Sequence, residues 1–226
     1  MDRLSVINLK MVNVYLLSGE KGCVLVDTGT KDSDVKILEA VKAQGFDPTD
    51  IKLIVLTHGH SDHFGSLRTL VDKTGAKVLV HKTEYDLMVT SGDDGVKGFS
   101  LLMKLIIGIA TKLSKNQTKS LDYKADILIE KTYDLSSYGI EGKIVETPGH
   151  TKGSISILLG DGKVLIGDSL MAMMPWSKPK RPMLGYDLNL IKESMEKLID
   201  LGASRFYLSH GKDYEVEVIK DALNRF

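Results

Sequence analysis

The sequence predicts one α/β domain in which two β-sheets are covered on the outside by helices. The chain has 226 residues, of which 42% are hydrophobic and 27% are charged, enough for one substantial core. Short runs of β-branched residues are interspersed with segments in which apolar residues recur at helical spacing. Two sheets with outer helices accommodate this order of segments.

The first half of the chain begins with strands and then alternates between helices and strands. Val35, Leu38 and Val41 recur at helical spacing and are followed by Gly45, which predicts a helix that ends there. The run IKLIVL is apolar almost throughout and predicts a strand buried on both faces. We predict strands at 4–9, 12–17, 22–27, 51–56 and 76–80, and helices within 30–46, 64–75 and 82–89.

The second half resumes the same pattern after a segment of different character. Residues 91–125 lack strand signals and include the apolar stretch FSLLMKLIIGIATKL at 99–113, which predicts a helical insertion or lid at about 85–125. We predict strands at 125–129, 142–147, 153–159, 163–167 and 205–209, and helices at 187–202 and 213–226.

Histidines and aspartates gather where predicted strands end. The stretch VLTHGHSDHFG at 55–65 follows one strand and contains His58, His60, Asp62 and His63. Three later strands are followed by His150, Asp168 and His210. Loops at one edge of a sheet converge on a site, so these side chains can meet in space. Imidazole and carboxylate groups suit zinc, iron or manganese, which predicts a metal site.

The segments THGHSDH, GHTKGS, GDS and SHG, in this order, resemble the metallo-β-lactamase-fold hydrolase superfamily, in its lactonase or glyoxalase-II-like branch. The resemblance covers about residues 10–212 and implies a four-layer αββα sandwich with a metal site at one edge of the two sheets. It also implies two divalent metal ions, zinc or alternatively iron or manganese. The first ion is assigned to His58, His60 and His150, and the second to Asp62, His63 and His210. Asp168 would bridge the two ions.

The same resemblance implies a hydrolase. Water shared by two such ions can lose a proton near neutral pH, because a bound metal lowers its pKa from 15.7 to about 7. We expect the resulting hydroxide to attack a carbonyl carbon in a lactone, ester or thioester of a small molecule, with Asp62 orienting it or relaying a proton. Asp27, in LVDTG, also matches the family pattern, and we expect it to hydrogen-bond a metal ligand. A structural turn-capping role is the alternative.

Substrate contacts are expected from the segment after Asp168. The run LMAMMPWSKPKRPML at 170–184 offers an adaptable apolar wall, from which we predict contacts by Met171, Met174 and Trp176. Tyr186 could replace the tyrosine that homoserine-lactone hydrolases of the superfamily typically carry soon after the bridging aspartate. Two other functions stay open: a mononuclear iron sulfur dioxygenase of the same fold, and a non-catalytic ligand-binding or regulatory protein.

Composition bears on partners and location. Thirty basic and thirty acidic residues balance, which argues against nucleic acid or an anionic membrane as the main partner. The beginning MDRLSVINLK has no apolar signal-type run, and the single cysteine cannot form an internal disulfide, so we expect a cytoplasmic location. The apolar segment 99–113 falls short of the ~20 residues that span a bilayer. We interpret it as a lid, a homodimer contact or a membrane-surface element.

Overall fold

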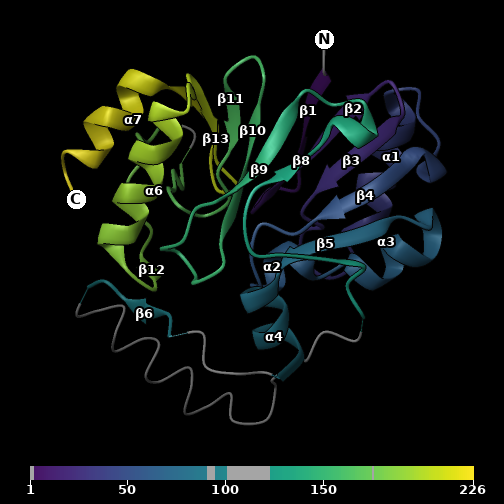
Figure 1. The fold of residues 1–226 in the computed structure, drawn as a ribbon, viewed down its shortest axis with the longest axis horizontal. Helices are drawn as coiled ribbons and strands as arrows, with labels where there is room; N and C mark the ends of the chain where they lie inside the picture. Colours follow the sequence, from purple (N-terminus) through teal and green to yellow (C-terminus); the bar gives the residue numbers. More distant parts are fainter. Residues whose placement is uncertain (1–2, 91–94, 101–122, 175) are drawn as a thin grey trace.

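Two six-stranded sheets pack against each other and helices cover their outer faces (Figure 1). The computed structural model describes residues 3–90, 95–100, 123–174 and 176–226. The first sheet has the order β1 (Arg3–Asn8), β2 (Asn13–Gly19), β3 (Gly22–Val26), β4 (Ile51–Val55), β5 (Lys77–His81) and β7 (Ile127–Ile129). The second has the order β14 (Asp213–Glu215), β13 (Arg205–Tyr207), β11 (Lys163–Leu165), β10 (Ile155–Leu159), β9 (Gly142–Glu146) and β8 (Tyr133–Asp134).

The helices fall into two sets, one for each sheet, with short elements between them. In the first half they are α1 (Asp34–Ala43), α2 (Ser61–Phe64), α3 (Leu67–Thr74) and α4 (Lys82–Thr90), and in the second half α6 (Leu188–Asp200) and α7 (Val216–Leu223). Two 3-10 turns are described at Pro48–Asp50 and Ser136–Tyr138, and β6 (Lys97–Gly98) pairs with β12 (Leu184–Gly185).

Successive side chains along a strand face opposite sides of the sheet, which explains why the layers form. In β2, Val14 and Leu16 face the core beneath α1 and α3, whereas Tyr15 and Leu17 face the core between the sheets. A third core joins the second sheet to α6 and α7, where Met195 is fully buried. The three apolar layers confirm the predicted αββα sandwich.

Strand direction brings the loops of interest to one edge. β3, β4 and β5 are parallel in the first sheet, as are β11 and β13 in the second. β9 and β11 each pair antiparallel with β10, so they run in the same direction as each other. The segments that follow β4, β9, β11 and β13 carry the predicted ligands, and each begins at the carboxyl end of its strand.

Two sequence predictions are wrong in detail. Residues 213–215, predicted as the start of the closing helix, form the edge strand β14, and α7 begins only at Val216. The strand pairs antiparallel with β13, and Arg205 of β13 also forms ion pairs with both Asp213 and Glu215. Residues 97–98, within the segment predicted to lack strands, form β6.

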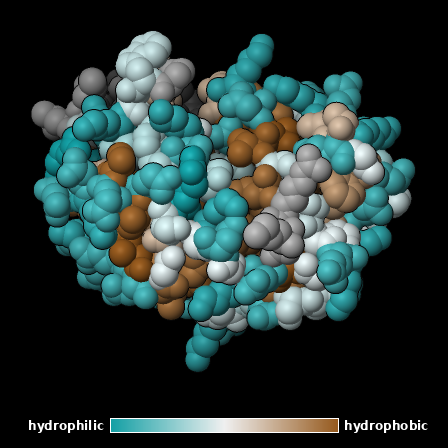
Figure 2. Space-filling model, turned by 90° about the horizontal axis from the view of Figure 1, so that it is seen from above, coloured by the Kyte–Doolittle hydropathy of each residue, from teal (hydrophilic) through white to brown (hydrophobic). Residues whose placement is uncertain are grey.

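The predicted apolar helix at 99–113 falls mostly on residues 101–122, which lie outside the described residues, so its roles as lid or dimer contact stay predictions. Among the described helices, none has the length and hydrophobicity needed to cross a membrane. On the face seen in Figure 2, hydrophilic residues cover most of the surface and hydrophobic residues show in separate patches. Such scattered apolar exposure is normal for a folded domain.

Candidate metal centre

The histidine-rich segment after β4 changes from extended to helical conformation within a few residues. His60 has extended backbone angles, φ −83° and ψ 145°, and stands at the N-cap of α2. Asp62 and His63 lie inside the first turn of that helix. The extended part and the helical part therefore present their side chains in two directions.

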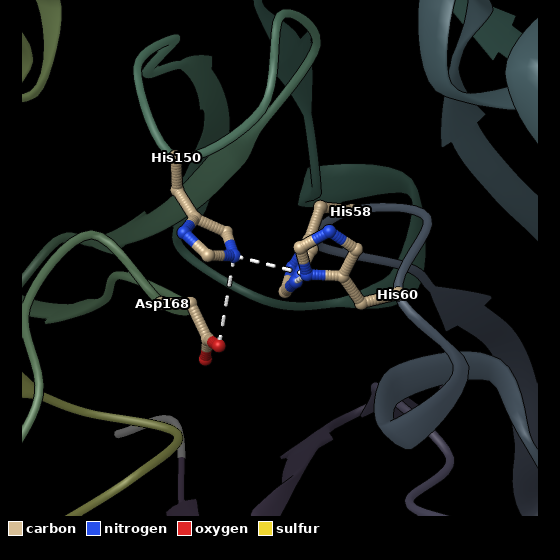
Figure 3. Close-up of side chains that lie close together, drawn as sticks. All are labelled: His58, His60, His150 and Asp168. Carbon is tan, nitrogen blue, oxygen red and sulfur yellow. Dashed lines mark hydrogen bonds and ion pairs between the residues drawn. The ribbon is translucent and has the colours of Figure 1, made fainter. Parts of the chain in front are cut away.

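The first donor group consists of His58, His60, His150 and Asp168, which come from both sheets (Figure 3). Nδ1 of His60 lies 3.1 Å from Nε2 of His58 and 3.1 Å from Nε2 of His150. Nε2 of His150 lies 3.7 Å from Oδ2 of Asp168. In this group one donor atom from each residue lies within 4.8 Å of the others, close enough for one ion to reach all four.

The second group consists of Asp62, His63 and His210, and Asp168 lies between the two groups. Oδ2 of Asp62 is 3.3 Å from Nε2 of His210 and 3.8 Å from Nε2 of His63. The Asp168 carboxylate approaches the same two rings, with Oδ1 3.3 Å from His63 and Oδ2 3.3 Å from His210. The seven predicted ligands thus lie together, and the Asp168 carboxylate lies between the two groups.

The donor set fits a divalent metal ion. Nε2 of His63 and Oδ1 of Asp168 are buried and have no hydrogen-bond partner, although buried polar atoms are normally satisfied. Both atoms belong to the cluster, where an ion would satisfy them. Nitrogen and oxygen donors without a thiolate suit zinc, iron or manganese.

Burial and charge separate the histidines into two kinds. Burial lowers the pKa of His58 well below its usual range, helped by the neighbouring histidines, and lowers that of His150 to about 4. Burial also opposes charge on His63 and His210, but carboxylates outweigh it. Asp168 and Asp27 raise the pKa of His63 well above its usual range, and Asp168 and Asp62 raise that of His210 to about 10.

These pKa shifts predict that metal binding releases protons. The raised pKa values favour the protonated rings of His63 and His210 in the metal-free chain, and a histidine must be neutral to coordinate, so these two rings should release up to two protons as metal binds. Metal affinity should therefore fall as the pH falls from 8 to 6. Calorimetric titration with zinc in buffers of different ionisation enthalpy measures the number. The His210→Gln variant should release about one proton fewer. A heat of zinc binding at pH 7 that is the same in all buffers would contradict the prediction.

Asp27 lies behind His63 and hydrogen-bonds its ring. It is fully buried and has the left-handed φ of 64°. Nδ1 of His63 donates to Oδ2 of Asp27 over 2.7 Å, and the Thr57 backbone N–H donates to Oδ1 over 2.8 Å. These contacts fix the orientation of the His63 ring and leave its Nε2 toward Asp168.

His210 is held in a comparable way by the turn between β1 and β2. Its Nδ1 donates to the Met11 carbonyl over 2.7 Å, so that Nε2 faces the carboxylates of Asp62 and Asp168. The side chain of Asn13 donates to the carbonyls of Leu208 and Gly211 on either side of His210. The first turn of the chain therefore positions a ligand in the loop that follows β13.

Glu84 is a supporting residue that sequence reasoning missed. Its carboxyl group is buried, and its two oxygens each accept a backbone hydrogen bond of 2.8 Å, from Gly59 and from Gly153. Gly59 lies between two ligands, and Gly153 follows His150 closely. A Cβ on Gly153 would lie 3.0 Å from Cγ of Glu84, so glycine permits this approach. Glu84 therefore ties together the two loops that supply the first donor group.

Two cavities lie beside the donors. A small one of about 170 Å³ is lined by Met171, Met183 and Leu184 and by five of the ligands: His60, Asp62, His150, Asp168 and His210. A larger one of about 460 Å³ includes Met174 in its wall. Of the predicted substrate contacts, Met171 and Met174 thus each line one cavity. Trp176 is 81% exposed and Tyr186 packs beneath Lys152, and neither lines these two cavities.

Comparison with known proteins agrees with this geometry. Residues 7–210 match the family described as the Metallo-beta-lactamase superfamily. The chain belongs to this superfamily. That membership and the His/Asp cluster together support a metal-dependent hydrolase.

Individual relatives of the superfamily are distant. The chain is 27% identical to the metallo-beta-lactamase fold-containing protein ST1585 of Sulfurisphaera tokodaii, over 96% of this chain and 78% of that protein. It is 29% identical to the probable metallo-hydrolase MJ0888 of Methanocaldococcus jannaschii, over 88% of this chain and 87% of that protein. Two other relatives are longer, and the chain covers 64% of each.

Solved structures share the fold. The crystal structure of ST1585 superposes with a TM-score of 0.67 at 26% identity, covering 98% of this chain and 85% of that one. The B3 metallo-beta-lactamase BLEG-1 superposes with a TM-score of 0.70 at 21% identity, covering 98% and 97%. The latter likeness concerns the fold alone.

Proposed function

We propose that this protein is a binuclear metallohydrolase, with zinc as the preferred metal, that cleaves a lactone, ester or thioester bond in a small molecule. The observation that supports the proposal most is the place of Asp168, whose two oxygens each lie 3.3 Å from a histidine of the second donor group while Oδ2 also faces His150 of the first. A carboxylate between two donor groups suits a pair of ions that share it.

The ions supply chemistry that the side chains lack. When bound, two divalent ions would add Lewis acidity and lower the pKa of water from 15.7 to about 7, which makes hydroxide available near neutral pH. His58, His60 and His150 would hold one ion, and Asp62, His63 and His210 the other. Asp27, Glu84 and the Met11 carbonyl keep these residues in place.

Asp62 is the member of the cluster best placed to handle a proton. Its side chain is 36% exposed and lines the small cavity, whereas the side chain of His63 is fully buried. Burial opposes its charge, but the hydrogen bond to His210 and the charge on His63 outweigh this and lower the pKa of Asp62. Asp62 is therefore ionised at neutral pH and can orient the attacking group or accept a proton from it.

The lining of the small cavity also indicates which kind of bond can react there. Met171, Met183 and Leu184 form an apolar wall opposite the donors. Such a wall excludes water and favours an uncharged group, such as a carbonyl, next to the ligands. This arrangement supports carbonyl substrates over a highly charged reacting centre.

Metal quantification followed by a hydrolysis screen tests the proposal. The protein is loaded with zinc, iron or manganese, and each form is assayed against lactones, esters, thioesters, β-lactams and phosphodiesters. Two ions per chain and turnover of a carbonyl substrate are expected. One iron per chain with oxygen consumption would instead indicate the sulfur dioxygenase, and absence of turnover with any substrate would favour a non-catalytic binding protein.

Asp62→Asn tests the role of the carboxylate in proton handling. Asparagine keeps the shape and one oxygen donor but cannot accept a proton, so turnover should fall by roughly 10²- to 10⁴-fold. The ion held by the first donor group should remain. Turnover and metal content are measured on the same samples, with Asp72→Asn on exposed α3 as the control. Unchanged turnover of Asp62→Asn would contradict the assignment.

A further inference from the structure

The larger cavity lies next to the metal centre and outside it. Three segments enclose it: the turn between β1 and β2, the loop at 172–174, and the loop at 209–212. His210 lines both this cavity and the small one. His210 therefore belongs to the walls of both cavities, and the larger one lies directly beside the donors. Its volume of about 460 Å³ lies in the range of small-molecule sites.

Methionines give the cavity an apolar and adaptable wall. Met11, Met173 and Met174 line it and are 77%, 61% and 53% exposed. Large apolar side chains exposed together in a hollow mark a binding surface more often than scattered ones do. Methionine is unbranched and flexible, so it adapts to an extended hydrocarbon chain.

The charged side chains that line the larger cavity are basic. Lys10 and Lys212 both line the cavity, and no carboxylate occurs among the described residues that line it. Lys10 is held in a turn with a left-handed φ of 75°, and its backbone N–H donates to the Asn8 side chain over 3.0 Å. The two ammonium groups come from opposite ends of the sequence and would both attract an anion.

We propose that this cavity binds the anionic, chain-like part of the substrate, with the hydrocarbon against the three methionines and the anion near Lys10 and Lys212. The substrate class is therefore an amphiphilic acyl compound that carries a carboxylate or phosphate some distance from its lactone, ester or thioester bond. The reaction at that bond rests on the proposed function, whereas binding in the cavity does not.

Calorimetric titration of the zinc-loaded protein with eight-carbon probes tests the proposal directly. The probes are octanoate, octyl phosphate, neutral octanol and octylammonium, each below its aggregation concentration. We expect both anions to bind, octanol to bind more weakly, and octylammonium least. Butanoate and hexanoate should bind more weakly than octanoate, by up to roughly fourfold per methylene group, the ratio that corresponds to about 0.8 kcal/mol per buried methylene. The stronger of octanoate and octyl phosphate identifies the preferred anion.

The double variant Lys10→Glu, Lys212→Glu should weaken octanoate and octyl phosphate more than tenfold and leave octanol nearly unchanged. Lys21→Glu is the matched control, because Lys21 is an exposed lysine on the turn between β2 and β3, remote from the cavity lining. Equal binding of anionic and neutral probes, no dependence on chain length, or no effect of the double variant would overturn the proposal.

Turnover of a small neutral ester such as phenyl acetate separates the two proposals. If the probes bind as expected and no ester, thioester or lactone is cleaved, the hydrolytic function fails and the binding proposal stands. If phenyl acetate is cleaved and the anionic probes do not bind, the binding proposal fails and the hydrolytic function stands.

Discussion

Asp168→Asn is expected to remove at least one metal ion per chain and to lower turnover by more than the roughly 10- to 100-fold that loss of an outer hydrogen-bond partner costs. Asp168 is 4% exposed and approaches His63, His150 and His210. Asparagine has nearly the same shape, so packing is preserved. It lacks the negative charge that both ions would share, and its NH₂ group cannot coordinate.

The metal content of Asp168→Asn is measured by elemental analysis after dialysis. Its turnover is measured with the best substrate of the hydrolysis screen. Asp161→Asn, on the exposed turn between β10 and β11, changes the same chemical group away from the donors and should match the wild type. Circular dichroism verifies that both variants are folded. Two tightly held ions and normal turnover in Asp168→Asn would contradict the bridging assignment.

Glu84→Gln should weaken metal binding by roughly 10- to 100-fold although the Glu84 carboxyl group accepts its hydrogen bonds from backbone groups of the ligand loops. A glutamine oxygen can accept from one of Gly59 and Gly153, but its NH₂ group then faces the other backbone N–H as a second donor. One buried N–H is left unsatisfied, which should also lower the free energy of unfolding by about 1–3 kcal/mol. The loops carrying His58, His60 and His150 lose their common anchor.

Competition with a chromophoric chelator measures the affinity at a temperature where the variant is fully folded, so that a loss of stability alone does not change the result. Asp86→Asn, exposed on the same helix α4, is the control. Gly59→Ala is an independent test, because its Cβ would lie 2.8 Å from Cγ of Met88 and 3.1 Å from Oε2 of Glu84. It should weaken metal binding in the same direction. Wild-type affinity in Glu84→Gln would show that Glu84 is structural only.

Local signals in the sequence were enough to predict most of the fold. The strands consist of short β-branched runs, most of them buried on both faces, and the helices have apolar residues at helical spacing, so each element carries its own pattern. The exception at 213–215 is instructive. The residues DYE precede the helical pattern of α7, and their strand conformation arises from pairing with β13, which is distant from any local pattern.

The candidate ligands were predictable for a related reason. Their residue types are rare in cores, and they stand at strand ends, which a parallel arrangement brings to one edge. Asp27 matched a family pattern, and the structure places it against His63. Glu84 had no such signal. It is an acidic residue in the first turn of a helix, an ordinary position, and its contacts arise only when three loops meet.

The sequence by itself determined which side chains can hold metal, where they stand on their strands, and that two sheets carry them. Only the tertiary structure decided how closely Asp168 approaches both donor groups, which backbone groups anchor the loops, and that Lys10 and Lys212 share a cavity with His210. The physical reason is that donor chemistry and periodicity are properties of single residues and short segments. Distances between loops far apart in the chain are set by how the two sheets pack.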